Sequence, residues 1–432
     1  MNKTPGLVVK HVVPVSASGS ASKSVDLRIE DGTITEISET DSLQAHENEE
    51  QFDAEGAYIS PGWMDMHVHF REPGQEHKET IKTGSDAAAA GGFTAVACMP
   101  NTDPAIHTRD VVEYIKKKSS DHAVAVHPIA CVTKERRGES ITEMADLKEG
   151  GAVAFSDDGD PVYNARVMRT ALEYSSMLSM PVINHEENYE LSRPGHMNEG
   201  KISTELGLEG TPGIAEEVMI ARDILLAEFT DGHIHVAHII TPRDVDHVRR
   251  AKERGIHITT EACPHHFDLT DEEIKRRSFD TNCKMHPPLR TQTDVDAIRT
   301  GLADGTIDAI CTDHAPHASQ EKEVEFIYAP NGITGLETAW AISVKRLLTP
   351  GVLTLPQLID KLAIQPRQIL SLDVPRIEPG ARAEFTIFNT NEQWTYRAAQ
   401  VKSKSHNSPY IGKKLTGRAI AIYNNSRFIV NG

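Results

Sequence analysis

The chain of 432 residues has few cysteines, few aromatic residues and no long apolar run. Its five cysteines, at positions 98, 131, 263, 283 and 311, show no paired spacing. This pattern is typical of buried free thiols in a reducing compartment. No apolar run approaches the roughly 18 residues that are needed to span a bilayer, and the first residues lack the apolar core of a secretory signal. We therefore expect a cytoplasmic protein without a membrane partner.

Basic residues are also scarce relative to acidic ones. The chain has 45 lysines and arginines against 63 aspartates and glutamates, which gives a net charge of -18. An acidic surface argues against nucleic acid or an anionic membrane as a partner. An anionic substrate must then be attracted by local cations, either metal ions or particular arginines.

From about residue 57, eight short apolar runs alternate with longer segments of helical composition. The runs are 63–69, 94–98, 123–132, 152–158, 182–185, 233–240, 256–263 and 307–313. Helical composition is clearest in 79–90, 214–229 and 241–254. This alternation predicts an α/β fold, a (β/α)8 TIM-like barrel whose active site lies at the C-terminal ends of the strands.

The two flanks of the chain have a different pattern. Residues 6–13, 25–38, 383–389 and 418–430 are short alternating segments, and Asp31-Gly32 and Asn424-Asn425 are tight-turn signals. We predict that residues 1–56 and 375–432 form one small composite β-sandwich domain, and that residues 57–374 form the barrel.

The most informative motif is His67-Val68-His69, at the end of the first run. Two histidines two positions apart on a strand point to the same side and can bind one metal ion. Asp158, His185, His238 and Asp313 lie at or near the ends of later runs. A single buried histidine is more often a core residue than a ligand. The clustering of all these residues at strand ends favours a metal-dependent hydrolase.

A dinuclear centre needs two pairs of ligands, a bridging group and an acid/base group. The predicted ligands are His67 and His69 for a first metal, Asp158 as the bridge, His185 and His238 for a second metal, and Asp313 for the first metal. Imidazole and carboxylate ligands without thiolate suit zinc, as one or two ions, while other divalent metals stay open. Such ions lower the pKa of bound water from about 15.7 toward neutrality. Asp313 would accept the proton and return it to the leaving nitrogen.

Two pairs of adjacent residues, Asp157-Asp158 and His265-His266, could each supply metal ligands. Asp157 and Asp158 point to opposite faces of a strand, and the small residues Ala154 and Ser156 favour Asp158 as the inward one. His265 and His266 are adjacent and point opposite ways, so we interpret them as structural.

Several motifs resemble those of the dihydroorotase family of the amidohydrolase superfamily, in its bacterial type related to the domain in multifunctional pyrimidine-synthesis proteins. The two signatures are residues 65–73 (DMHVHFREP) and residues 312–317 (TDHAPH), the latter followed by Lys322. Further matching segments are 99–102 (MPNT), 284–290 (KMHPPLR), 332–337 (GITGLE) and 403–410 (SKSHNSPY). The resemblance extends from about residue 6 to residue 430.

The resemblance implies the reversible ring closure of N-carbamoyl-L-aspartate to L-dihydroorotate with loss of water, in pyrimidine (UMP) synthesis. Asp313 would then be the catalytic acid/base, and Arg71 and Asn101 would hold the free carboxylate of the substrate. The implied substrate contacts are His69, Phe70, Arg71, Asn101, His286, His317, Asn331 and Gly332.

The chain departs from the family pattern at two places. Residues 154–159 (AFSDDG) contain no lysine, whereas many members of the superfamily bridge their metals with a carboxylated lysine. Asp158 therefore resembles the variant in which an aspartate bridges directly, and the occupancy of the second metal position stays open. His286 stands where asparagine is expected, so a substrate contact there is either made by imidazole or lost.

Two other functions are compatible with parts of this pattern. Allantoinases and hydantoinases share the barrel and the metals, but they generally use the lysine bridge and lack the pairing of Arg71 with residues 99–102. A non-catalytic dihydroorotase-like scaffold for aspartate transcarbamoylase is disfavoured because all six ligand positions are intact. An active enzyme that associates with that transcarbamoylase stays open, and the family favours homodimers.

Overall fold

The computed structural model describes residues 6–15 and 23–431, and its centre is a closed barrel of parallel strands. The barrel strands are β6 (Trp63–Val68), β7 (Phe93–Cys98), β8 (Ala125–Pro128), β9 (Phe155–Ser156), β10 (Val182–Asn184), β13 (Ile234–Val236), β14 (Ile258–Ala262) and β15 (Ala309–Ile310). They pair side by side as two sheets, β6-β7-β8 and β9-β10-β13-β14-β15. Single parallel bridges from Ala130 to Phe155 and from Val68 to His314 join the two sheets into a ring. Each predicted apolar run overlaps one of these strands, and the predicted barrel is confirmed.

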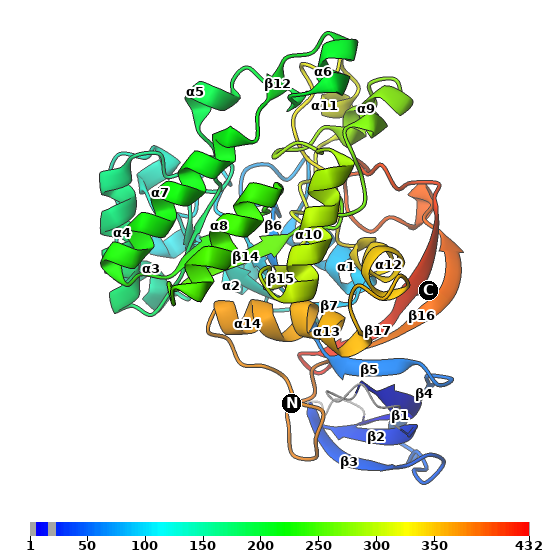
Figure 1. The fold of residues 1–432 in the computed structure, drawn as a ribbon. Coiled ribbons are helices and arrows are strands. Elements are labelled where there is room, and N and C mark those ends of the chain that lie inside the picture. The colour runs from blue at the N-terminus through cyan, green and yellow to red at the C-terminus, as the bar shows by residue number, and fades with distance from the viewer. Residues whose placement is uncertain (1–5, 16–22, 432) are drawn as a thin grey trace.

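Helices surround the barrel and fill the connections between its strands (Figure 1). The longer ones are α1 (Ile81–Gly91), α2 (Arg109–Ser119), α3 (Met144–Gly150), α4 (Ala165–Met177), α7 (Ile214–Thr230), α8 (Pro242–Glu253) and α10 (Gln292–Asp304). Shorter elements are α5 (Tyr189–Ser192), α6 (Lys201–Leu206), α9 (Glu272–Arg276), α11 (Ser319–Lys322), α12 (Ala339–Ser343), α13 (Leu355–Ile359) and α14 (Gln365–Ile369), with the two-residue strands β11 (Met197–Asn198) and β12 (Gly210–Thr211). Single 3-10 turns occupy η1 (Lys134–Arg136), η2 (Thr281–Cys283) and η5 (Ala398–Gln400), whereas η3 (Val344–Leu348) and η4 (Asp360–Ile364) are π-helical segments that continue α12 and α13.

Local sequence explains where these helices begin and end. The Thr241 hydroxyl caps α8 by accepting a hydrogen bond from the Asp244 N–H, and the Asp244 carboxylate accepts one from the Thr241 N–H. Pro242 occupies the first turn. Helix α1 ends at Gly92, whose φ of 92° is left-handed and suits glycine. Among the helices of the described ranges, none is both long and apolar enough to cross a membrane.

Strands from both ends of the chain form one further sheet beside the barrel. Its members are β1 (Gly6–Pro14), β2 (Val25–Glu30), β3 (Thr33–Glu39), β4 (Glu49–Asp53), β5 (Tyr58–Pro61), β16 (Phe385–Thr395), β17 (Lys414–Asn424) and β18 (Arg427–Val430). The order is β18-β17-β16-β5-β1-β2-β3, and β4 pairs with β1. Figure 1 shows these blue and red strands together at one side of the barrel. Because β5 belongs to this sheet, the sheet extends to Pro61, beyond the predicted boundary at residue 56. The division into domains stays a prediction.

Small and apolar side chains fill the inside of the barrel. Met64, Met66, Ala154, Ile183 and Ala237 belong to one buried cluster there. All five cysteines are buried free thiols. The polar residues that concern function lie at one end of this filled core, where the parallel strands terminate.

Candidate metal centre

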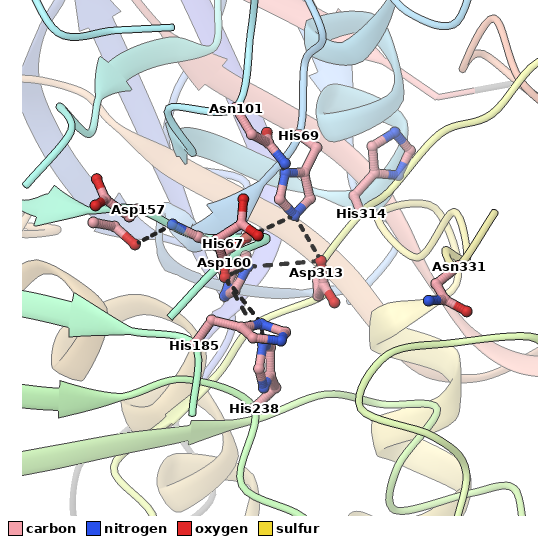
Figure 2. A network of polar contacts seen from close by, with 12 residues as sticks. His67, His69, Asn101, Asp157, Asp160, His185, His238, Asp313, His314 and Asn331 are labelled. Carbon is pink, nitrogen blue, oxygen red and sulfur yellow. Dashed lines mark hydrogen bonds and ion pairs between the residues drawn. The ribbon is translucent and has the colours of Figure 1, made fainter. Parts of the chain in front are cut away.

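The C-terminal ends of the barrel strands bring six predicted ligands together. They are His67 and His69 at the end of β6, Asp158 after β9, His185 after β10, His238 after β13 and Asp313 after β15. All six are buried. Figure 2 shows the four histidines and Asp313 turned toward a common centre.

Asp158 lies in the middle of this group. Its Oδ1 is 3.5 Å from His67 Nε2, 3.6 Å from His185 Nδ1 and 3.8 Å from His238 Nε2, and its Oδ2 is 3.5 Å from His69 Nε2. One carboxylate thus faces four imidazoles, which is the arrangement that a bridging ligand requires.

Asp313 completes the group on the side of the first histidine pair. Its Oδ1 lies 2.9 Å from His69 Nε2 and 3.6 Å from His67 Nε2. His185 Nδ1 lies 3.0 Å from His238 Nε2, so the second histidine pair is also in place.

The donor set fits a metal centre. His67 Nε2 and Asp158 Oδ1 are buried and have no hydrogen-bond partner among the described residues. Ligand atoms about 2.0–2.2 Å from one zinc ion are roughly 3.3 Å apart, close to the 3.5 Å between these two atoms. Buried polar atoms without partners are costly, and a metal ion would satisfy both.

The charges of the group match its use as ligands. Burial alone would raise the pKa of Asp158, but His67, His185 and His238 hold that pKa well below its usual range. The pKa of Asp313 is lowered in the same way, against burial, by His67 and His69. Both carboxyl groups are therefore ionised, as metal binding requires.

A second layer of side chains orients the histidines. Glu261, on β14, holds His67 Nδ1 through its Oε1 at 2.5 Å, and its Oε2 lies 3.3 Å from His235 Nε2. Asn101 Oδ1 accepts a hydrogen bond from His69 Nδ1 at 2.8 Å. Each contact fixes the ring so that Nε2 faces the centre. The sequence interpretation missed Glu261, although a carboxylate inside an apolar strand requires a buried partner.

Three of the predicted site residues have left-handed backbone angles. The φ values are 62° for Arg71, 31° for His238 and 44° for Asp313. Non-glycine residues adopt this region at a cost, and such strain concentrates at functional sites. Here it turns each chain sharply at the end of its strand and directs the side chain toward the centre.

Asp157 and the pair His265-His266 lie outside the group. Asp157 accepts hydrogen bonds from the Thr133 N–H at 3.0 Å and from the Thr133 hydroxyl, and Figure 2 shows it to one side of the histidines. His266 Nε2 donates to the Pro287 carbonyl at 3.0 Å. The structure therefore turns Asp158, and not Asp157, toward the four imidazoles.

A cavity of about 240 Å³ opens above the ligand group. Of the predicted substrate contacts, it is lined by His69, Arg71, Asn101, His286, His317, Asn331 and Gly332. Phe70 is the exception, since it is not among the residues that line this cavity. Its ring lies against α1, where a Cβ on Gly84 would be 2.5 Å from it. The Phe70 side chain is therefore packed against that helix and does not line the cavity.

Arg71 supplies a fixed cation to this cavity. Its Nε donates to the Pro316 carbonyl at 3.2 Å. Burial lowers the pKa of Arg71 to about 10, which leaves the guanidinium charged at neutral pH. The acidic chain thus has a positive group where an anionic substrate would bind.

One wall of the cavity is held by the segment 403–410. Asn407 donates to the carbonyls of Ala315 at 2.9 Å and Gly332 at 3.0 Å, and accepts from the His317 N–H at 3.0 Å. His317 Nε2 donates to the Asn331 carbonyl at 2.8 Å. The sequence interpretation matched this segment to the family but assigned Asn407 no role.

His286 lies on another wall and has a partner that the sequence interpretation missed. Its Nε2 is 3.1 Å from Glu187 Oε2, and its ring stacks on that of His185 with centroids 5.2 Å apart. Glu187 also accepts a hydrogen bond from the Ser192 hydroxyl. The imidazole is therefore held in place beside the ligand group.

The closed parallel barrel, the ligand group at its strand ends and the sheet from both termini define the class: a (β/α)8 barrel with a candidate metal centre and a composite β domain. Solved structures share this fold over nearly the whole chain. L-hydantoinase (dihydropyrimidinase) from Arthrobacter aurescens has a TM-score of 0.86 at 21% identity, covering 98% of this chain and 96% of that one. Dihydropyrimidinase from Brevibacillus agri NCHU1002 has a TM-score of 0.83 at 20% identity, covering 98% and 95%.

Sequence comparison defines the family within this class. The family model Dihydro-orotase-like matches residues 56–244. Dihydroorotase from Citrifermentans bemidjiense is 48% identical over 415 residues, which covers 96% of this chain and 97% of the relative. Dihydroorotase from Syntrophus aciditrophicus is 49% identical over 397 residues, which covers 92% of each. The chain belongs to the dihydroorotase family.

Proposed function

We propose that this protein is a dihydroorotase, which catalyses the reversible cyclisation of N-carbamoyl-L-aspartate to L-dihydroorotate and water in pyrimidine synthesis. The observation that carries the proposal is Arg71, a charged guanidinium in the cavity directly beside the six buried ligands. An anionic cyclic amide needs both a cation for its carboxylate and a polarising centre for its carbonyl. The dihydroorotase relatives, at 48% and 49% identity, support the same reaction.

The proposed cofactor is zinc, as one or two ions. We assign His67, His69 and Asp313 to the first ion, His185 and His238 to the second, and Asp158 to the bridge. A bound divalent ion polarises the scissile carbonyl and makes water nucleophilic near neutral pH.

Asp313 is the proposed catalytic acid/base. Its Oδ1 is held by His69, which leaves the second oxygen to take up or deliver a proton. In the hydrolytic direction the amide C–N bond breaks, a C–O bond forms, and Asp313 passes a proton to the leaving nitrogen. In the cyclisation the C–N bond forms, and Asp313 protonates the oxygen that departs as water.

Arg71 and Asn101 are the proposed ligands of the free carboxylate. A guanidinium binds a carboxylate with charge-assisted hydrogen bonds. Asn101 uses its Oδ1 to accept from His69, so its Nδ2 is left to donate to the substrate. His317, Asn331 and Gly332 also line the cavity.

His286 is the proposed replacement for the asparagine that the family pattern predicts. Glu187 engages its Nε2, and this leaves Nδ1 for the substrate. The contact is then made by an imidazole whose orientation Glu187 fixes.

Two alternative functions receive less support. A hydantoinase or allantoinase would be expected to have a bridging lysine, whereas here Asp158 occupies the centre of the ligand group. A non-catalytic scaffold would not be expected to retain six converging ligands. For cell location we propose the cytoplasm, because all five cysteines are buried free thiols.

The reaction is tested by following the ultraviolet absorbance of dihydroorotate as the purified zinc-loaded protein opens its ring. Allantoin and a hydantoin are run in parallel, and a chelator is added to a second sample. We expect loss of dihydroorotate that the chelator abolishes. Turnover of allantoin or the hydantoin instead would contradict the proposal. Adding aspartate transcarbamoylase to the same assay tests whether that enzyme associates and changes the rate.

The carboxylate assignment is tested by Arg71→Ala. Loss of a charge-assisted hydrogen bond, about 1.5–3 kcal/mol, predicts a roughly ten- to hundredfold fall in kcat/KM for carbamoyl-aspartate, with unchanged metal content. Arg376→Ala is the matched control, because that side chain is 74% exposed and is not among the residues that line the cavity. Full activity of Arg71→Ala would refute the assignment.

A further inference from the structure

A turn directly after β14 brings together three further residues of metal-ligating type. Residues 264–268 form this turn, and the His266 N–H donates to the Cys263 carbonyl at 2.9 Å. Pro264 occupies the second position of the turn, which its fixed φ favours. The sequence interpretation placed His265 and His266 on opposite faces of a strand. The turn instead brings their rings to a centroid distance of 4.2 Å.

Cys263, His265 and His266 offer one ligand atom each, and these atoms lie within 4.8 Å of one another. All three residues are buried. Cysteine sulfur and imidazole nitrogen are the ligands that zinc prefers in proteins. Ligand atoms of a tetrahedral zinc site are roughly 3.3–3.6 Å apart, so side-chain movements of about 1 Å close these three around one ion.

Two imidazole nitrogens of this cluster lack a partner. His265 Nε2 and His266 Nδ1 are buried and have no hydrogen bond among the described residues. Cys263 has a single S–H group, which can satisfy only one of the two nitrogens. Buried polar atoms without partners are costly, and native structures contain few of them. A metal ion in the turn satisfies both nitrogens at once.

The surroundings of the two imidazoles suit ligation. His266 Nε2 donates to the Pro287 carbonyl at 3.0 Å, and ligating histidines commonly donate their second ring N–H to a backbone carbonyl. This contact selects the tautomer in which His266 Nδ1 has a free electron pair. Burial lowers the pKa of His266 to about 3 and also lowers the pKa of His265. Both rings are therefore neutral at neutral pH, which is the form that binds metal.

We propose that Cys263, His265 and His266 form a thiolate site for one zinc ion, separate from the candidate metal centre. All three residues lie outside the set of six ligands and outside the lining of the cavity above it. Zinc replaces the proton of the Cys263 thiol and forms one Zn–S bond and two Zn–N bonds, and the proton passes to solvent. Three protein ligands leave the fourth position of a tetrahedral ion to water.

The position of the turn indicates what such an ion does. Through Pro287, His266 is joined to the segment that carries Met285 and His286, and both of these residues line the cavity. An ion that fixes the His266 ring therefore also fixes this wall. The proposed zinc is structural: it positions the wall and takes no part in the reaction.

The first test counts zinc in the purified, zinc-loaded full chain by elemental analysis. Cys263→Ala is expected to bind about one zinc ion per chain fewer than the wild type, because it removes the thiolate ligand. Cys283→Ala is the matched control, since Cys283 is also a buried free thiol but belongs to η2. Equal zinc contents of the wild type and a folded Cys263→Ala would overturn the proposal.

A second test is already decisive in the wild type. Cobalt(II) is added to the metal-free chain, where thiolate ligation gives a strong near-ultraviolet charge-transfer band. The candidate metal centre contains only imidazoles and carboxylates, which do not give that band. We expect the band in the wild type and in Cys283→Ala, and its loss in Cys263→Ala. Bound cobalt without the band in the wild type, or a band that persists in Cys263→Ala, refutes the site. Both readouts are independent of the proposed reaction.

Discussion

At the scale of single residues, Asp157 and Asp158 show how a shift of one position along the chain separates a candidate metal ligand from a structural carboxylate. They are chain neighbours with the same side chain, and both are buried. The alternation of the chain sends Asp158 to the imidazoles and Asp157 to Thr133. One carboxylate is a candidate metal ligand, and the other holds the loop after β8.

These two residues therefore make a matched pair for mutagenesis. Asp158→Asn is expected to lose nearly all bound metal and more than a hundredfold of the turnover, because it removes the central carboxylate. Asp157→Asn is expected to keep its metal and to lose about 1–3 kcal/mol of unfolding free energy, the value of its hydrogen bonds to Thr133. Metal analysis and denaturant unfolding provide the measurements. Metal loss in Asp157→Asn with retention in Asp158→Asn would reverse the assignment.

The sequence reveals site residues that form a local pattern, and it does not reveal those whose partners are distant in the chain. His67 and His69 are recognisable because their spacing alone puts them on one side of a strand. Glu261 has no such local signal, since its partner His67 is 194 residues away. Glu187 was missed for the same reason, because only the fold brings it to His286.

At the scale of elements, the segment 403–410 works as a brace that comes from far along the chain. It has no regular structure near Asn407, yet that side chain joins Ala315, His317 and Gly332. Gly332 has a φ of 150°, and a Cβ there would lie 2.6 Å from the Ala315 carbonyl oxygen. The wall of the cavity thus depends on close backbone packing that Asn407 maintains.

Asn407→Ala should therefore loosen the cavity without touching the ligand group. Three hydrogen bonds are lost, each worth about 1 kcal/mol, so KM is expected to rise by up to about a hundredfold while metal content and most of kcat are retained. Steady-state kinetics with metal analysis measures this separation. Asn391→Ala, at an exposed position of β16, serves as the control. A fall in metal content as large as the change in KM would argue against the role of a brace.

The eight predicted barrel strands agree with the structure in number and order but less well in length. The run 152–158 predicts one strand, whereas β9 comprises only Phe155 and Ser156. The chain leaves the sheet there to form the turn that carries Asp158. A hydrophobic pattern reports burial, and burial continues beyond the last hydrogen bond of a strand, so the pattern cannot locate that end.

At the scale of the whole molecule, the ligand group makes stability depend on the metal. Carboxylates and imidazoles are concentrated in a buried volume, where unmatched charge is costly. A ligand that binds only the folded state stabilises it by about 2.7 kcal/mol when its free concentration is a hundred times Kd.

We therefore expect a chelator to lower the unfolding temperature of the wild type and zinc to restore it. Asp158→Asn should show little change under either treatment, because it lacks the central ligand. Thermal unfolding with each addition provides the measurement. If the chelator leaves the unfolding temperature of the wild type unchanged, these residues do not form a metal centre.

The pairing of β5 with β16 also determines when, during synthesis of the chain, the composite sheet can form. The Trp63 N–H, just after β5, donates to the Thr386 hydroxyl, 323 residues further along the chain. At roughly 5–20 residues per second on the ribosome, about 16–65 seconds separate the synthesis of these two partners. During that interval β5 has an open edge, which is the kind of surface that promotes aggregation. The N-terminal strands can therefore complete their sheet only after the C-terminal strands are synthesised. A chain that stops before β16 leaves the edge of β5 permanently unpaired.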